Sequence, residues 1–200
     1  METKSKSDEK KERVLRAASE VFARYGFDKT TLDDIGKRAG LNKASLYYSF
    51  KNKEDLFVAV VLAETQTFLA DLQARTLAYP DVRKQIRFFL TERIRRYGEV
   101  LPLTRLSVGS LHRMEPMFDE LYQGTKAGEL AFLITLLRKA VTENALTLTL
   151  PSAVLADHLF YLSDALKHGI VRTATTLNAD EIDFAPAIEQ MEFWLQTVLR

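Results

Sequence analysis

The sequence predicts an all-α fold in which a small N-terminal unit of three helices precedes a larger helical bundle. Apolar residues recur at helical spacing along most of the 200 residues, and capping residues and glycines mark where helices start and end. At 46% hydrophobic residues, the chain has enough apolar side chains for a packed core. It has no cysteine, which excludes disulfides, thiolate metal sites and cysteine nucleophiles.

The first two helices follow from local signals. An apolar stripe predicts a first helix that stops at Gly26. A second helix is expected to open at Thr31, because Asp34 completes a capping-box pattern with it, and to end at Gly40. The stripe of the first helix consists of Val14, Ala18, Val21, Phe22 and Tyr25.

The rest of the chain is also expected to be helical. A fourth helix is predicted over about 53–78, and a fifth carries an apolar stripe from Ile86 to Tyr97. Residues 103–124 are less regular, and we expect a short helix ending near His112 and another starting after Pro116. Further helices are expected over 129–143, 151–175 and 184–199, with an extended connector at 146–150 and a polar loop at 176–183.

Positive charge is concentrated in the first quarter of the chain. Residues 1–53 hold 13 Lys and Arg against 8 Asp and Glu, a net charge of +5, whereas residues 54–200 hold 15 against 19, a net charge of −4. A basic segment on a mildly acidic body favours contact with a polyanion, although a solvated surface would give the same pattern.

The turn between the second and third helices is the most informative local feature. The third helix is expected over 43–50, with Asn42 as its cap, so two short helices are joined by the tight turn Gly40-Leu41-Asn42. A short glycine-containing turn of this kind is typical of a helix-turn-helix unit. The N-terminal part of the second helix of such a unit enters the major groove of DNA. That part carries Lys43, Ala44, Ser45, Tyr47 and Tyr48.

The same segment resembles the DNA-binding domain of the TetR/AcrR family of transcriptional regulators, over about a quarter of the chain. The sequence departs from the usual pattern at Gly36, where alanine is usual, at Asn42, where serine is common, and at Ser49, where histidine is common. The matching residues are Ala17-Ala-x-x-x-Phe22, Tyr25-Gly-Phe27, Thr30-Thr31, Ile35, Ala39-Gly40-Leu41, Leu46-Tyr47-Tyr48-x-Phe50 and Lys51-x-Lys53-Glu54-x-Leu56.

Side-chain chemistry suggests how such a head would contact double-stranded DNA. Thr31 and Lys53, each at a helix N-terminus, and the hydroxyl of Tyr48 are candidates for phosphate contacts. The candidates for base edges are Lys43, Ser45 and Tyr47. The alternatives are core packing for the tyrosines and a solvated cap residue for Lys43. The domain boundary is placed between residues 53 and 54, giving a head of 1–53 and a body of 54–200.

The resemblance implies that the body is a helical domain for dimerisation and ligand sensing, with the last two helices at the interface of a homodimer. Two stripes fit that role: Leu155, Leu159, Leu162 and Leu166, and Ile188, Met191, Leu195 and Val198. An aromatic interior would suit a small, mostly apolar effector. The candidate pocket residues are Tyr97, His112, Phe118, Tyr122, Phe132 and His158. Ordinary intramolecular core is the alternative for both stripes and for the aromatic residues.

Other classes of function find little support. The sequence has no nucleophile elbow, no phosphate-binding glycine loop and no histidine cluster, and its three histidines argue against an enzyme. We expect no catalytic residues, no metal and no cofactor. A polar N-terminus and the lack of a long apolar run predict a cytoplasmic protein without membrane spans. The expected function is a regulator, most often a repressor by resemblance, that binds a near-palindromic operator and is released by a ligand. The alternative is a DNA-binding regulator controlled by a protein partner.

Overall fold

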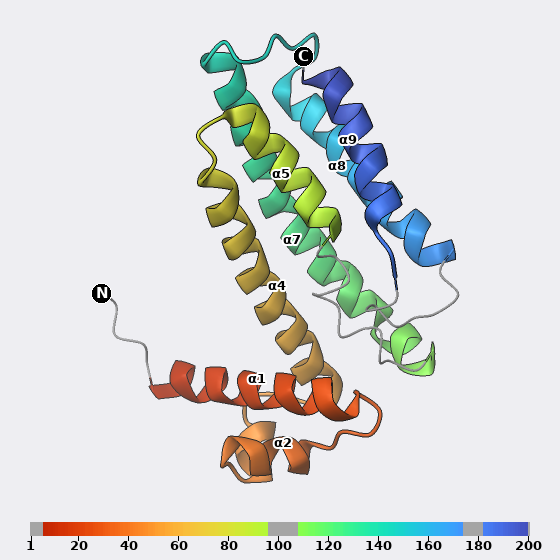
Figure 1. Cartoon of the computed structure of the whole chain (residues 1–200). Coiled ribbons are helices and arrows are strands. Elements are labelled where there is room, and N and C mark those ends of the chain that lie inside the picture. Colours follow the sequence, from red (N-terminus) through yellow and green to blue (C-terminus); the bar gives the residue numbers. More distant parts are fainter. Residues whose placement is uncertain (1–5, 96–107, 174–181, 200) are drawn as a thin grey trace. The chain divides into compact units, whose positions relative to one another are not determined.

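The computed structural model describes residues 6–95, 108–173 and 182–199, and these contain helices and no strand (Figure 1). The all-α class predicted from the sequence is therefore confirmed. The helices are α1 (Lys6–Tyr25), α2 (Leu32–Ala39), α3 (Lys43–Tyr47), α4 (Lys53–Leu77), α5 (Val82–Arg95), α7 (Val108–Thr142), α8 (Ser152–Thr173) and α9 (Ala185–Val198). No stretch of the described helices has the length and apolarity needed to cross a bilayer.

The chain forms two compact units. The first comprises Met1–Thr65 with Pro102–Tyr122, and the second comprises Gln66–Leu101 with Gln123–Arg200. Helices α4 and α7 each contribute residues to both units. Each unit has its own apolar core, and the two are described separately below.

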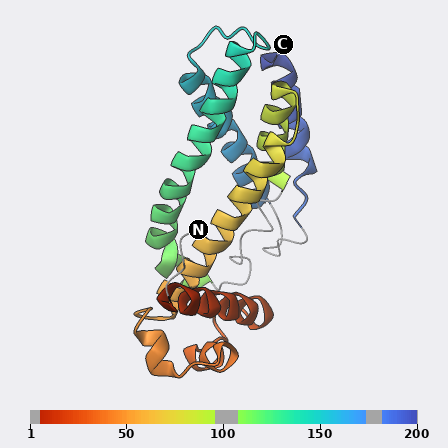
Figure 2. The ribbon, with the colours of Figure 1, turned by 90° about the vertical axis from the view of Figure 1, so that its left-hand side faces the viewer.

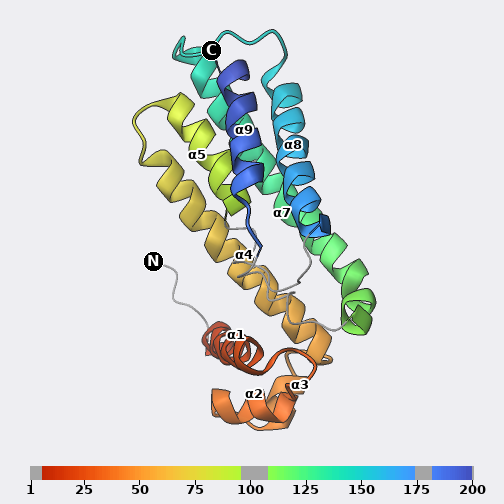
Figure 3. The same ribbon diagram turned by 45° about the vertical axis from the view of Figure 1, so that its right-hand side comes forward.

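The first unit is built around an aromatic centre. The Phe57 ring meets the rings of Phe22 and Phe27 edge-on, with centroids 5.0 Å apart in both pairs. Helices α2 and α3 lie side by side on one face of α1 (Figure 3). Their inward residues Ile35 and Leu46 are fully buried in the same core. Burial of these side chains fixes the angle between the two short helices, which are too short to be stable alone.

The second unit packs α8 and α9 against α5, with the C-terminal part of α7 in the same core. Phe89 and Phe132 meet edge to face there, with ring centroids 5.2 Å apart. The segment 146–150 contains no strand, as expected of a connector. Arg83 of α5 donates through Nε to the carbonyl oxygen of Ala145 at 2.8 Å, which ties the end of α7 to α5.

Helix α7 corrects one prediction. The expectation of two helices separated near Pro116 is wrong, because α7 runs without a break from Val108 to Thr142 with Pro116 inside it (Figure 2). A proline inside a helix removes one backbone hydrogen bond and crowds the preceding turn. Met114 and Leu121, on either side of Pro116, both pack into the core of the first unit. Their burial offsets the cost of the proline, and hydrophobic periodicity around residue 116 was too weak to reveal it.

Candidate nucleic-acid interface

The start of α2 is fixed by the predicted capping box. The backbone N–H of Asp34 donates to the hydroxyl oxygen of Thr31 at 3.2 Å, and the backbone N–H of Thr31 donates to Oδ2 of Asp34 at 3.0 Å. The side-chain hydrogen bond from Thr31, followed by the backbone bond, lowers the pKa of the Asp34 carboxyl below its ordinary value. The box therefore stays intact at neutral pH.

The turn between α2 and α3 depends on two glycines. Gly40 has φ of +64°, a left-handed conformation that favours glycine, and it ends α2 as predicted. Leu41 donates its backbone N–H to the carbonyl oxygen of Gly36 at 2.9 Å. A Cβ added to Gly36 would lie 2.9 Å from the carbonyl oxygen of Leu41. The departure from alanine at position 36 thus has a structural reason, since a methyl group there would strain the turn.

Helix α3 is short, and both aromatic and small side chains near it are exposed to solvent. The Oδ1 atom of Asn42 accepts from the backbone N–H of Ser45 at 2.9 Å, which confirms Asn42 as the cap. The helix ends at Tyr47 rather than Phe50. Tyr48 is 90% exposed and Tyr47 is 50% exposed, so neither is a core residue. Ala44 is also exposed and Ser45 is half-buried, while the side chain of Lys43 lies outside the described part of the structure.

Comparison with known proteins gives the same result for this segment. A family model for bacterial regulatory proteins of the tetR family matches residues 14–60. Over these residues the chain is similar to the bacterial regulatory proteins of the tetR family. The resemblance inferred from the head is therefore confirmed.

Individual relatives extend the comparison. The regulator is 40% identical over 65 residues to the HTH-type transcriptional regulator RutR of Escherichia coli, a match that covers 32% of this chain and only 31% of RutR. Over 202 residues it is 24% identical to the uncharacterized HTH-type transcriptional regulator YfiR of Bacillus subtilis, covering 99% of this chain and 96% of YfiR. A solved transcriptional regulator of Cytophaga hutchinsonii shares the fold, with a TM-score of 0.79 at 24% identity, covering 94% of this chain and 98% of that one.

Two residues predicted to contact phosphate already have partners inside the regulator. The ammonium of Lys53 donates to the carbonyl oxygens of Phe27 and Thr30 at 2.8 and 3.0 Å, and it lies 4.2 Å from the centre of the Phe27 ring. The backbone N–H and hydroxyl of Thr31 are both bonded to Asp34. Lys53 thus closes the loop after α1, a role that the sequence did not reveal because its partners lie 26 and 23 residues away.

The first unit contains a contribution from α7 that the sequence also did not reveal. Ser110 donates its hydroxyl to Oδ1 of Asp28 at 2.6 Å, and Met114 is fully buried in the core of this unit. The start of α7 is therefore attached to the loop that follows α1. No sequence motif pointed to this contact, because neither residue belongs to a recognisable pattern.

The candidate pocket residues lie only partly within the described structure. Tyr97 and the side chains of His112 and Phe118 lie outside the described part of the structure. Tyr122 belongs to the first unit, whereas Phe132 packs against the core of the second and His158 is exposed on α8. No group of three His, Asp or Glu among the described residues is placed to hold a metal ion.

The apolar stripes of α8 and α9 lie mainly within the fold. Leu155, Leu159, Met191 and Leu195 are buried in the core of the second unit, which is the alternative considered for these stripes. Leu162, Leu166, Ile188 and Val198 pack partly buried against the same core. Periodicity identified the buried side of each helix, but it could not show whether the same chain covers that side. The large apolar side chains left exposed on these helices are Val154, Tyr161, Phe193 and Trp194.

A buried ionic cluster lies in the second unit. Arg93 of α5 donates through Nη2 to Oδ1 of Asp164 at 2.8 Å and through Nη1 to Oγ of Ser163 at 3.0 Å, and its Nε is bonded to Glu129 of α7. Lys167 lies 2.7 Å from the same Oδ1 of Asp164. Burial alone would lower the pKa of Arg93, but the two carboxylates raise it, so the guanidinium stays charged. Burial, followed by the charge of Arg93, lowers the pKa of Lys167 to about 8.

Proposed function

We propose that the regulator represses transcription by binding a near-palindromic operator as a homodimer, and that a small, mostly apolar ligand releases it. The observation that carries the DNA-binding part is the α2–turn–α3 geometry. A capped recognition helix rests on buried Leu46, and exposed Tyr47 and Tyr48 project from it. This arrangement supports insertion of α3 into the major groove.

The proposed contacts are of two kinds: phosphate contacts that position the protein on DNA, and base contacts that recognise the sequence. Ser45 and Tyr47, with Lys43 beside them, meet base edges, Tyr48 gives its hydroxyl to a phosphate, and Ala44 allows close approach. Lys53 has three N–H donors and uses two of them on backbone carbonyls. The third is left for a phosphate. At Thr31, a phosphate would have to replace the carboxylate of Asp34.

A homodimer is proposed because one short recognition helix reads too few base pairs for genomic specificity. Two copies related by a two-fold axis would read a near-palindrome. Support comes from the exposed aromatic side chains on α8 and α9, Tyr161 at 60% and Phe193 at 64% exposure, with Trp194 beside Phe193. Aromatic residues that protrude in this way are enriched at protein interfaces.

The dimer is tested by placing charge on the exposed surface rather than on the buried stripe. Phe193→Asp should give monomers in light scattering and weaken operator binding. Leu195→Asp is a poor test, because Leu195 is fully buried and a charge there would unfold the second unit. A wild-type protein that is monomeric at micromolar concentration would remove this part of the proposal.

Ligand control is supported by polar groups placed within an apolar interior. The second unit holds Arg93, Glu129 and Asp164 among apolar side chains, and a few polar groups of this kind are typical of ligand sites. Helices α4 and α7 contribute to both units, which supports transmission between them. The ligand must bind better to the conformation that does not fit DNA.

The whole proposal is tested by selecting binding sites from a pool of randomised duplexes and sequencing the survivors. We expect enrichment of a near-palindrome with half-sites about one helical turn apart. A screen of apolar metabolites by thermal shift, followed by titration of each hit against the DNA complex, then tests release. Hits that leave DNA affinity unchanged would remove the switch and would favour control by a protein partner.

A further inference from the structure

A pocket of about 280 Å³ lies on the second unit between the end of α4 and α5, lined by Arg75, Ala78, Tyr79 and Phe88. The rings of Tyr79 and Phe88, with centroids 5.0 Å apart, give it an aromatic wall. The guanidinium carbon of Arg75 lies 5.2 Å from the centre of the Phe88 ring. A fixed cation thus borders an aromatic surface that is open to solvent.

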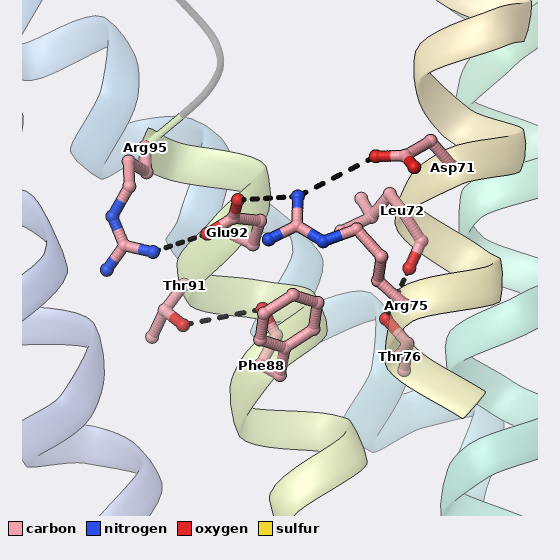
Figure 4. A network of polar contacts seen from close by, with 8 residues as sticks. All are labelled: Asp71, Leu72, Arg75, Thr76, Phe88, Thr91, Glu92 and Arg95. Carbon is pink, nitrogen blue, oxygen red and sulfur yellow. Dashed lines mark hydrogen bonds and ion pairs between the residues drawn. The ribbon is translucent and has the colours of Figure 1, made fainter. Parts of the chain in front are cut away.

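Arg75 is held in place by ion pairs with two carboxylates, and one pair is stronger than the other. Figure 4 shows its side chain reaching from α4 across Phe88 toward Glu92 of α5. Its Nη1 atom lies 3.2 Å from Oε1 of Glu92, whose side chain is 5% exposed, and 3.6 Å from Oδ2 of Asp71, whose side chain is 51% exposed. The pair with Asp71 is therefore the weaker one, because solvent screens it. Glu92 also pairs with Arg95, which helps to hold its carboxylate in position.

Hydrogen bonds also hold the backbone that carries Tyr79. Gln85, which is buried, donates through Nε2 to the carbonyl oxygen of Tyr79 at 2.6 Å. The backbone N–H of Tyr79 donates to the carbonyl oxygen of Thr76 at 3.3 Å, and the hydroxyl of Thr76 donates to the carbonyl oxygen of Leu72 at 2.7 Å (Figure 4 shows the last of these). A site whose walls are already ordered loses little entropy when a ligand binds.

We propose that this pocket binds a small aromatic carboxylate. Both ion-pair contacts described for Arg75 use Nη1, which leaves Nε and Nη2 for a bidentate contact with the ligand carboxylate. The ligand ring lies on Tyr79 and Phe88. The volume is just below the range of about 300–1,000 Å³ that drug-sized ligands occupy, so the ligand has a single ring.

Charge balance favours displacement of Asp71 rather than Glu92. Asp71, Arg75, Glu92 and Arg95 sum to zero charge, so an added carboxylate competes with Asp71 and Glu92 for the positive charge of Arg75. The carboxylate of Asp71 is half-exposed and its pair with Arg75 is screened by solvent, whereas Glu92 is buried and would lose one of its two arginine partners. The site belongs to the second unit alone and does not rest on the proposed DNA-binding function.

The test uses benzoate as the probe, titrated into the full-length protein by calorimetry up to about 10 mM, because a ligand with so few atoms binds weakly. Benzamide has the ring without the charge, and acetate has the charge without the ring. We expect saturable binding of benzoate and at least about ten-fold weaker binding of both analogues. Equal binding of benzoate and benzamide, or no binding of benzoate, would overturn the proposal.

Variants locate the site. Arg75→Gln should weaken benzoate binding at least about ten-fold, and Arg138→Gln, at an exposed arginine of α7, should leave it unchanged. Asp71→Asn keeps Arg75 and removes the competing carboxylate, so it should tighten binding about two- to five-fold. Unchanged affinity in Arg75→Gln would refute the site. If Arg75→Gln does not fold, unchanged or weaker binding in Asp71→Asn would refute it.

Discussion

Removing Arg93 tests the buried ionic cluster most sharply. In Arg93→Met, Glu129 and Asp164 lose their guanidinium partner, although Asp164 keeps Lys167 at 2.7 Å. Among the described residues of the cluster, Glu129 then keeps no hydrogen-bonding partner and only the more distant charge of Lys167. Removing one member of a buried ion pair costs about 3–5 kcal/mol. That is a large fraction of the roughly 5–15 kcal/mol that stabilises a typical domain.

The matched control is Arg87→Met, on the same helix. Arg87 pairs with Glu192 at partly exposed positions, so its loss should cost less than about 1 kcal/mol. Urea unfolding followed by circular dichroism, at one fixed protein concentration, measures both variants. Adding Glu129→Leu to Arg93→Met should recover part of the loss, because the unpaired buried charge is then gone. If Arg93→Met falls within about 1 kcal/mol of Arg87→Met, the cluster does not stabilise the fold in the way described.

Three further changes have distinct expected outcomes. Gly36→Ala should lower the melting temperature, because the new Cβ would lie 2.9 Å from the carbonyl oxygen of Leu41 and this clash outweighs a helix-propensity gain of about 1 kcal/mol. The control is Gly128→Ala in α7, where a Cβ would meet no other atom, and it should raise the melting temperature. Lys53→Met should destabilise the head by about 1–3 kcal/mol in urea unfolding. It should also reduce by about one the slope of the logarithm of the DNA-binding constant against the logarithm of the salt concentration. A variant that changes this slope but not the stability would contradict the structural role. Burial and a neighbouring guanidinium lower the pKa of Lys167 from 10.5 to about 8, so between these pH values the unfolded chain binds more protons. The free energy of unfolding should therefore gain a contribution that rises from about pH 8 to 10.5 and is absent in Lys167→Met.

Local chemistry explains why much of the head could be predicted from the sequence. The capping box at Thr31, the left-handed turn at Gly40 and the cap at Asn42 depend on atoms within a few residues of each other. Such contacts leave signatures at fixed spacing. By contrast, Lys53 meets carbonyls 23 and 26 residues away, and nothing in the spacing indicates that its charge is used inside the fold.

The second unit shows what the sequence left open. Arg93 contacts residues 36 and 71 positions away on two other helices, and no periodic pattern separates it from the exposed arginines of α5. The stripes of α8 and α9 correctly marked an apolar face, but the exposed aromatic residues Tyr161 and Phe193 lie off those stripes. Which apolar face remains open is decided by long-range packing, which hydrophobic periodicity does not encode.

The central claim is that α3 recognises a DNA sequence. The ratio of the dissociation constants for scrambled and for operator DNA tests this claim directly. The full-length protein is titrated with the selected operator and with a scrambled duplex at the same salt concentration, by fluorescence anisotropy. We expect the operator to bind at least about 10³-fold more tightly. Tyr47→Ala, at a position that is 50% exposed and so tolerates truncation, should reduce that preference by about 1–3 kcal/mol while scrambled DNA binds as before. A wild-type protein with no preference, or a preference that Tyr47→Ala leaves unchanged, would contradict the claim.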